Sequence, residues 1–262
     1  MMINVLGFGL MGKQISALLY LSGCEVNIYS RNDINEKDFL RQVKILKKSL
    51  RDTREGKYVL YAELNELPNC TTIESVVEDI TIKKEIYEKI RLNNNSLYLT
   101  NTSSYSPDEI SSEILGMHFF NPISLGLIEL SNNNVKQEEL GDLSSLVSKF
   151  ESLGYVVVDV NENRGYIGNY ILFHEISSAL KLVEKFGYGV EQINQVYSKL
   201  YDGRDIFFII DLIGIDVSYK ILSNLKEVDE TIYMPKTLKK ALERNILGRK
   251  NKTTIKSIIE DV

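Results

Sequence analysis

The chain has 262 residues, of which 44% are hydrophobic and 26% charged, a globular composition long enough for one large domain or two modest ones. Its net charge of -5 disfavours nucleic acid as a partner, because phosphate binding depends mostly on Lys and Arg. Two cysteines, Cys24 and Cys70, are too few for a disulfide framework or a four-cysteine zinc site, so we expect no metal.

The N-terminal segment MMINVLGFGLMG lacks the basic start of a signal peptide, and two of its glycines interrupt the apolar run. The sequence also contains no window of about 18 uncharged apolar residues, the length that a membrane-spanning helix needs. We therefore expect no membrane partner and a cytoplasmic location.

Residues 1–160 alternate short β-rich runs with helical patterns. Strands are expected at 3–9, 25–30, 57–63, 74–78, 96–101, 116–120, 126–131 and 155–160. Alternating strands and helices predict an α/β fold with a doubly wound, mostly parallel, Rossmann-like sheet.

The first expected strand runs into the sequence GFGLMG. Gly7, Gly9 and Gly12 have the spacing of a dinucleotide fingerprint. In it, the first glycine allows a tight turn, the second lets the backbone approach pyrophosphate, and the third lets helix pack on strand. Leu10 and Met11 complete the turn, and the pyrophosphate then meets a helix N-terminus. We expect these residues to bind the cofactor; the alternative is an ordinary glycine-rich turn.

The end of the second expected strand should carry an acid for the ribose 2′-hydroxyl of NAD. Ser30 and Arg31 stand there instead, and Asp33 lies beyond the expected strand end. A hydroxyl followed by Arg favours a 2′-phosphate, because Arg makes bidentate charged hydrogen bonds to phosphate. We therefore expect NADP(H) to be favoured over NAD(H); the alternative is a solvated arginine.

The chain has two histidines. His118, in GMHFFNP, lies at the end of an apolar run, where open α/β sheets place residues that contact ligands. A lone histidine at a strand end is more often a buried core residue, so its neighbours matter. His174 lies inside a helical pattern, and we expect it to contribute to packing or to an interface.

Residues 161–262 show one helical pattern after another, and we place a domain boundary near Asn161–Asn163. We expect a dinucleotide-binding domain at 1–160 and a helical substrate and dimerisation domain at 161–262. The apolar run Ile206–Ile210 would be exposed on a lone monomer, which predicts a homodimer.

Several motifs together resemble the 3-hydroxyacyl-CoA dehydrogenase family over nearly the whole chain. They are GFGLMG, ESVVEDITIKKEIY, TNTSS (100–104), GMHFFNP (116–122), GYIGNYIL, DLIGIDV and LGRK. The resemblance implies hydride transfer between a nicotinamide and the C3 hydroxyl or keto group of a 3-hydroxyacyl thioester. The expected fold is a Rossmann-like domain followed by an all-helical domain.

The resemblance assigns the catalytic roles. His118 is implied to be the general base for oxidation and the general acid for reduction, since a histidine pKa lies near neutral. Glu129 is implied to pair with it, although the run between them is one residue shorter than in the family. Ser103 and Asn169 are implied to bind the substrate oxygen. The alternatives are a surface glutamate, a turn cap and a polar helix position.

The resemblance also assigns binding residues. Glu78 and Lys83 match positions near the nicotinamide ribose, Asn101 belongs to the cofactor site and Asn121 to the substrate site. For Glu78 and Lys83 the alternative is a solvated helix start.

A coenzyme A substrate needs cations for its phosphates, and the family uses a helical projection here. Lys44, Lys48 and Arg51 would lie near one face of a helix over 37–57. The alternative is a solvated helix face, because acidic residues are interspersed.

A short-chain 3-hydroxyacyl-CoA in fatty acid metabolism is the expected substrate. One alternative keeps the chemistry but changes the carrier to an acyl carrier protein bearing a hydroxyacyl or hydroxymalonyl group. The other alternative is a non-catalytic nucleotide-binding protein, like the crystallin relatives of the family.

Overall fold

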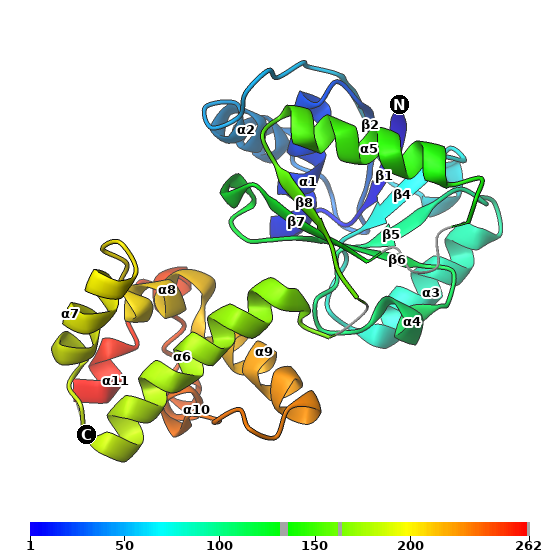
Figure 1. The fold of residues 1–262 in the computed structure, drawn as a ribbon. Helices are drawn as coiled ribbons and strands as arrows, with labels where there is room; N and C mark the ends of the chain where they lie inside the picture. Colours follow the sequence, from blue (N-terminus) through cyan, green and yellow to red (C-terminus); the bar gives the residue numbers. More distant parts are fainter. Residues whose placement is uncertain (132–135, 162–163, 261–262) are drawn as a thin grey trace. The chain divides into compact units, whose positions relative to one another are not determined.

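The computed structural model of the protein describes residues 1–131, 136–161 and 164–260. The chain divides into two compact units, Met1–Tyr166 and Ile167–Val262. In Figure 1 the first unit combines a sheet with helices, whereas the described part of the second unit is helical.

The first unit is built on a single sheet, which has eight strands in the described part of the chain. The strands are β1 (Met2–Leu6), β2 (Glu25–Tyr29), β3 (Lys57–Tyr61), β4 (Thr71–Glu74), β5 (Tyr98–Thr100), β6 (Leu115–Phe119), β7 (Leu127–Ser131) and β8 (Val156–Asp159). Their order is β3-β2-β1-β4-β5-β6-β7-β8, and every pair is parallel except β6 with β7. The predicted doubly wound, mostly parallel sheet is confirmed.

Helices cover both faces of this sheet. They are α1 (Leu10–Leu21), α2 (Glu36–Leu46), α3 (Ile80–Arg91), α4 (Pro107–Ile110) and α5 (Leu140–Ser152), with short 3-10 turns η1 (Leu64–Glu66) and η2 (Ile123–Leu125). Side chains of α1, α2 and α5 share one core with Ile3 and Val5 of β1. Side chains of α3 and α4 share another with Leu6, because successive residues of a strand face opposite sides.

The second unit is a helical bundle with a core of its own. Its helices are α6 (Tyr166–Phe186), α7 (Val190–Leu200), α8 (Ile206–Ile213), α9 (Ile215–Val228), α10 (Lys236–Glu243) and α11 (Lys256–Glu260), with the 3-10 turn η3 (Gly248–Asn251). The expected boundary at Asn161–Asn163 falls partly outside the described residues and stays a prediction. No helix in the described ranges has the length and apolar character to cross a membrane.

The apolar run in α8 corrects one expectation. Ile206, Phe207 and Ile210 are fully buried in the bundle, so the run as a whole is not exposed on the monomer. The residues lie on the inward face of α8 because positions three and four apart share a helix face, and Ile210 is four residues from Ile206 and three from Phe207. Phe208 and Leu212 remain exposed on the other face.

The strand expected at 74–78 is also wrong in its bounds. β4 ends at Glu74, whose carboxylate accepts a hydrogen bond of 2.6 Å from the backbone N–H of Val76. The chain turns out of the sheet there, and the carbonyl of Ser75 lies against Gly7.

The helix expected over 37–57 is shorter than predicted. α2 ends at Leu46, so Lys44 is helical but Lys48 and Arg51 follow the helix and do not continue its face. The carbonyl of Leu46 accepts hydrogen bonds from the N–H groups of Ser49 (2.9 Å) and Leu50 (3.2 Å). These bonds close a turn beyond the last helical residue.

Candidate active site

The glycine turn after β1 has the space that a dinucleotide needs. A Cβ on Gly7 would lie 2.4 Å from the carbonyl oxygen of Ser75, and one on Gly12 would lie 2.1 Å from the carbonyl oxygen of Gly7. Both positions therefore require glycine for close packing. At Gly9, no described atom beyond the chain neighbours lies within 4 Å of a Cβ, so this face is open. The turn fits a pyrophosphate that approaches the backbone at Gly9.

Leu10 and Met11 follow in the first turn of α1. Gly9 is the N-cap residue and has no side chain that could accept from the first N–H groups of the helix. A helix N-terminus of this kind binds an anion through its backbone donors. Leu10 is exposed and Met11 is half-buried, so both lie at the rim of the turn.

Ser30 and Arg31 directly follow β2. The hydroxyl of Ser30 accepts a hydrogen bond of 3.2 Å from the backbone N–H of Asn32. Arg31 is exposed and lines a cavity of about 430 Å³ together with residues of α3. The other charged residues that line it are Lys89, Glu63 and Glu85. Lys89 lies in an ordinary amphipathic helix pattern, so the sequence alone did not indicate a binding role for it.

A buried ion cluster joins β4 to α3. The ammonium of Lys83 lies 2.9 Å from a carboxylate oxygen of Glu74 and 2.9 Å from one of Glu78. The side chains of Lys83 and Glu74 are each 1% exposed. Glu74 also accepts a hydrogen bond of 2.7 Å from the hydroxyl of Thr100. The structure therefore places the Lys83 ammonium inside the unit, not on a solvated helix start.

Glu78 connects this cluster to the loop after β5. Its carboxylate accepts hydrogen bonds from the hydroxyl of Thr102 (2.6 Å) and from the N–H groups of Ser103 and Ser104 (3.2 Å each). Burial opposes ionisation, yet the Lys83 ammonium and the Thr102 hydroxyl hold the pKa of Glu78 below its ordinary value. Glu78 thereby fixes the backbone that carries Ser103.

His118 and Glu129 face each other across β6 and β7. They are directly paired in the antiparallel register, and Nδ1 of His118 lies 2.9 Å from a carboxylate oxygen of Glu129. Only 7% of His118 and 2% of Glu129 is exposed. Because a carboxylate only accepts, Nδ1 carries the proton of this bond and Nε2 remains to exchange a proton with a substrate.

Asn101 and Asn121 flank this pair along the chain. The side-chain oxygen of Asn101, directly after β5, accepts a hydrogen bond of 2.9 Å from the N–H of Phe119. This bond ties the loop of residues 100–104 to β6. Asn121 is exposed and precedes Pro122 through a cis peptide bond.

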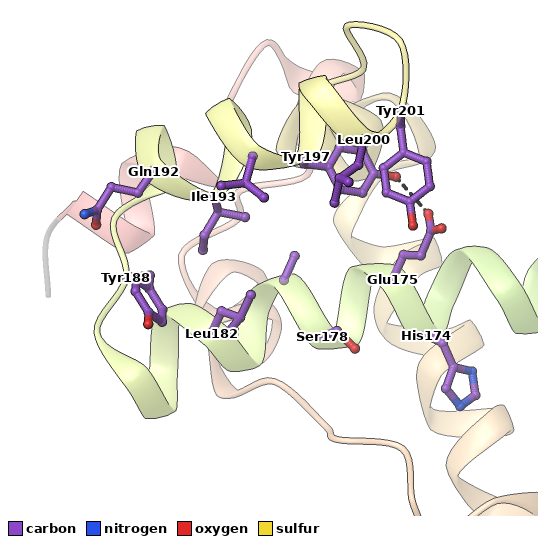
Figure 2. A pocket seen from close by; sticks show the side chains of 12 residues that line it. His174, Glu175, Ser178, Leu182, Tyr188, Gln192, Ile193, Tyr197, Leu200 and Tyr201 are labelled. Carbon is purple, nitrogen blue, oxygen red and sulfur yellow. Dashed lines mark hydrogen bonds between the residues drawn. The ribbon is translucent and has the colours of Figure 1, made fainter.

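Asn169 and His174 belong to α6 of the second unit, whereas His118 belongs to the first. Asn169 is buried. Nδ1 of His174 donates to the carbonyl of Tyr170 (2.8 Å), and its Nε2 lies 3.5 Å from a carboxylate oxygen of Asp229. Figure 2 shows His174 at one end of a groove of about 780 Å³ between α6 and α7.

Two residues of the site, Glu74 and Tyr166, have no role that the sequence motifs predicted. Glu74 was assigned to a strand, and its only signal was an acid in an otherwise apolar run. The ring of Tyr166 stacks on the imidazole of His118, with ring centres 4.9 Å apart and ring planes 15° apart. In the sequence, Tyr166 stands out only as part of GYIGN, a motif that was noted for Asn169.

Comparison with known proteins gives consistent matches along the chain. The family model described as 3-hydroxyacyl-CoA dehydrogenase, NAD binding domain, matches residues 2–163, and the one described as its C-terminal domain matches residues 165–257. A 3-hydroxybutyryl-CoA dehydrogenase of Clostridioides difficile is 33% identical over 193 residues, which cover 69% of this chain and 68% of that protein.

Two further matches cover most of the chain. A putative fatty acid oxidation complex trifunctional enzyme of Rickettsia prowazekii is 28% identical over 94% of this chain, which spans only 39% of that protein. A crystal structure of Mycobacterium tuberculosis FadB2 is similar in fold, with a TM-score of 0.81, 22% identity and 97% of both chains covered.

Proposed function

The chain belongs to the 3-hydroxyacyl-CoA dehydrogenase family, as its motifs predicted, and we propose that it is an active dehydrogenase. It transfers a hydride between a nicotinamide dinucleotide and the C3 hydroxyl or keto group of a 3-hydroxyacyl thioester. The observation that carries this proposal is the buried His118–Glu129 pair. A non-catalytic nucleotide-binding protein would have no use for a partnered histidine at the end of a strand.

The chemistry follows from how this pair is held. In the oxidative direction Nε2 of His118 takes the proton of the C3 hydroxyl, and in the reductive direction it returns the proton. Glu129 keeps the imidazole in this tautomer and stabilises the imidazolium. Ser103, whose backbone N–H is held by Glu78 in the same unit, hydrogen-bonds the substrate oxygen. The nicotinamide, when bound, accepts or supplies the hydride.

The cofactor rests on three groups of residues. Gly7, Gly9, Leu10, Met11 and Gly12 hold the pyrophosphate, Ser30 and Arg31 hold the ribose of the adenosine half, and Glu78, Lys83 and Asn101 form the nicotinamide side. Since the Lys83 ammonium is enclosed by two carboxylates, we assign it to support of Glu78 and not to direct contact with the ribose.

We propose that NADP(H) is preferred. Arg31 lines the cavity beyond β2, and Lys89 adds a second cation that suits a 2′-phosphate. Glu63 and Glu85 face the same cavity and oppose this preference. The arginine carries the proposal because it lies two residues past the end of β2, the strand end that meets the ribose in a dinucleotide-binding fold.

The proposed substrate is a short-chain 3-hydroxyacyl-CoA in fatty acid metabolism, with Asn121 on the substrate side. The name of the Clostridioides difficile relative supports a short acyl chain. The alternative is an acyl-carrier-protein-bound hydroxyacyl or hydroxymalonyl group. We propose a cytoplasmic location, because Cys24 and Cys70 are unpaired and the cytoplasm keeps thiols reduced.

We also propose a homodimer formed through the helical unit. Large apolar side chains of its helices are exposed: Ile171, Phe186, Val196, Leu200, Phe208 and Leu212. Apolar surface of this extent commonly marks an interface. Sedimentation at micromolar concentration should give the mass of a dimer, and a stable monomer would refute this.

An assay of cofactor oxidation with acetoacetyl-CoA tests the activity. The protein should oxidise NADPH, and more slowly NADH, in the presence of this substrate. Replacing coenzyme A by acyl carrier protein as the carrier of the acetoacetyl group separates the two carriers. No turnover of either thioester with either cofactor would overturn the proposal.

A further inference from the structure

Tyr166 covers one face of the histidine that the proposed reaction uses. Its ring lies nearly parallel to the imidazole of His118, with ring centres 4.9 Å apart and planes 15° apart. Tyr166 is 3% exposed, so the contact excludes water from that face. Phe120 contacts the same imidazole differently, at 6.0 Å and 67°.

The backbone at Tyr166 is unusual for a tyrosine. Its φ is +53° and that of Gly165 is +88°, so two successive residues are left-handed. The other described non-glycine residues with positive φ are Asp52, Asp202, Asn245 and Lys252. Asp and Asn tolerate this region well, but a large aromatic residue does so only where its surroundings impose it.

Neighbouring residues leave space for the Tyr166 ring and hold its backbone. A Cβ on Gly116 would lie 2.0 Å from the hydroxyl oxygen of Tyr166, so the strand that carries His118 has glycine where the ring arrives. The N–H of Gly165 donates a hydrogen bond of 2.8 Å to the carbonyl of Ser103. The Gly165–Tyr166 dipeptide therefore contacts the residues assigned to proton transfer and to substrate binding.

We propose that Tyr166 is a positioning residue for His118, an inference that rests on the proposed dehydrogenase function. The hydrogen bond to Glu129 constrains one atom of the imidazole, and the ring plane can still tilt through small torsions about the Cα–Cβ and Cβ–Cγ bonds. A stacked ring on one face removes this freedom, so Nε2 is held in one direction. Reaction rates depend steeply on such alignment of the reacting groups.

Steady-state kinetics of Tyr166→Leu test this role. We expect kcat to fall about tenfold, the scale of an aromatic pair, with little change in the KM of the cofactor. Tyr166→Phe keeps the stacked ring and should stay within about threefold of the wild type. Tyr58→Leu, which removes another ring of the same unit, is the control for a general packing loss. An equal loss of kcat in Tyr166→Phe and Tyr166→Leu would overturn the proposal.

A double-mutant cycle separates positioning from packing. If Tyr166 acts through the histidine, adding Tyr166→Leu to His118→Gln should cause no further loss of kcat. The same tenfold loss in both backgrounds would refute the proposal. A wild-type protein as slow as His118→Gln would instead refute the proposed function, which keeps the two failures distinguishable.

Two further measurements serve if Tyr166→Leu folds poorly. Gly116→Ala should displace the Tyr166 ring and lower kcat, and Tyr166→Phe in the same chain should restore it by removing the clashing oxygen. In proton NMR spectra, the ring current of Tyr166 should shift the ring-proton signals of His118 upfield of those of a histidine in an unstructured peptide. Failure of the rescue, or no upfield shift in the wild type, would overturn the proposal.

Discussion

The first unit carries two charged regions that differ in how their charges are partnered. Buried Glu74 and Lys83 form an ion cluster with half-buried Glu78, and each charge in it touches another. Lys44 and Lys48, on and after α2, are exposed to solvent. The buried cluster has its geometry before any ligand arrives, whereas the exposed cations acquire a role only if a phosphate comes to them.

This difference determines how much each region contributes to the free energy of unfolding. Removing one member of a buried ion pair leaves an uncompensated charge and costs about 3–5 kcal/mol. Removing an exposed cation costs the protein little stability, because water solvates the partner that is left behind. Substitutions in the buried region should therefore act on folding and on the site together, and substitutions in the exposed region only on binding.

The largest effect should come from Lys83→Met. Its ammonium is 1% exposed between two carboxylates, so its loss should lower the free energy of unfolding by about 3–5 kcal/mol. Chemical denaturation followed by circular dichroism measures this. Lys47→Met removes the exposed partner of Glu55 (2.6 Å) and is the matched control, expected to change stability very little. Equal stabilities of the two variants would contradict the comparison.

The buried cluster also predicts a pH dependence. The carboxylates outweigh the opposing effect of burial and raise the pKa of Lys83. The stabilisation from Lys83 is therefore complete below the ordinary lysine pKa and is lost as the pH rises through the raised value. The pKa of Glu78 is lowered, so its contribution is present above the ordinary glutamate pKa and is lost in acid. The stability difference between wild type and Lys83→Met should be constant near neutrality and shrink at both extremes.

His118→Gln should have the next largest effect. The imidazole is the proposed acid–base group, and losing such a group lowers turnover by at least about 100-fold. Cofactor binding, followed by fluorescence of the reduced nicotinamide, should be unchanged. Glu129→Gln should lower kcat by a similar factor or less, since it orients and stabilises the histidine. Near wild-type turnover of His118→Gln, with chemistry limiting the rate, would refute the mechanism.

Local patterns in the sequence were enough to predict much of the fold. The glycine spacing after β1 and the position of His118 at a strand end depend on residues close in the chain. Tyr166 was missed because its partner His118 is distant in sequence. Glu74 was missed because its contacts with Lys83 and Thr100 form only when the helix after β4 and the neighbouring strand β5 pack around it. The end of α2 before Lys48 was missed because it depends on hydrogen bonds of the following turn.

Substitution of the exposed Arg31 tests whether an exposed cation determines the choice of cofactor. If it binds a 2′-phosphate, Arg31→Ala should lower the ratio of kcat/KM for NADPH to that for NADH by roughly tenfold, the value of one charge-assisted hydrogen bond. Lys89→Ala should lower the same ratio by a smaller factor. An NADH preference in the wild type, or an unchanged ratio in Arg31→Ala, would refute the NADP(H) preference. Asp33 would then be the candidate partner of the ribose.

The smallest effect should come from the exposed cations near α2. If Lys44, Lys48 and Arg51 hold phosphates of coenzyme A, reversing all three charges should raise the KM of acetoacetyl-CoA by roughly tenfold or less, because each exposed pair contributes only about 0.2–1 kcal/mol.

The KM of an acetoacetyl-pantetheine thioester, which lacks the nucleotide, should hardly change. Reversing Lys236, Lys239 and Lys240 of α10 changes the net charge equally and controls for long-range repulsion. Because Lys48 and Arg51 lie beyond the end of α2, one shared helix face cannot bring the three cations together, and only a ligand spanning the turn could use all of them. An equal rise of KM for both thioesters, or an equal effect of the α10 variant, would show that these residues are solvated and do not bind coenzyme A. The choice of carrier would then depend on the acyl-carrier-protein assay.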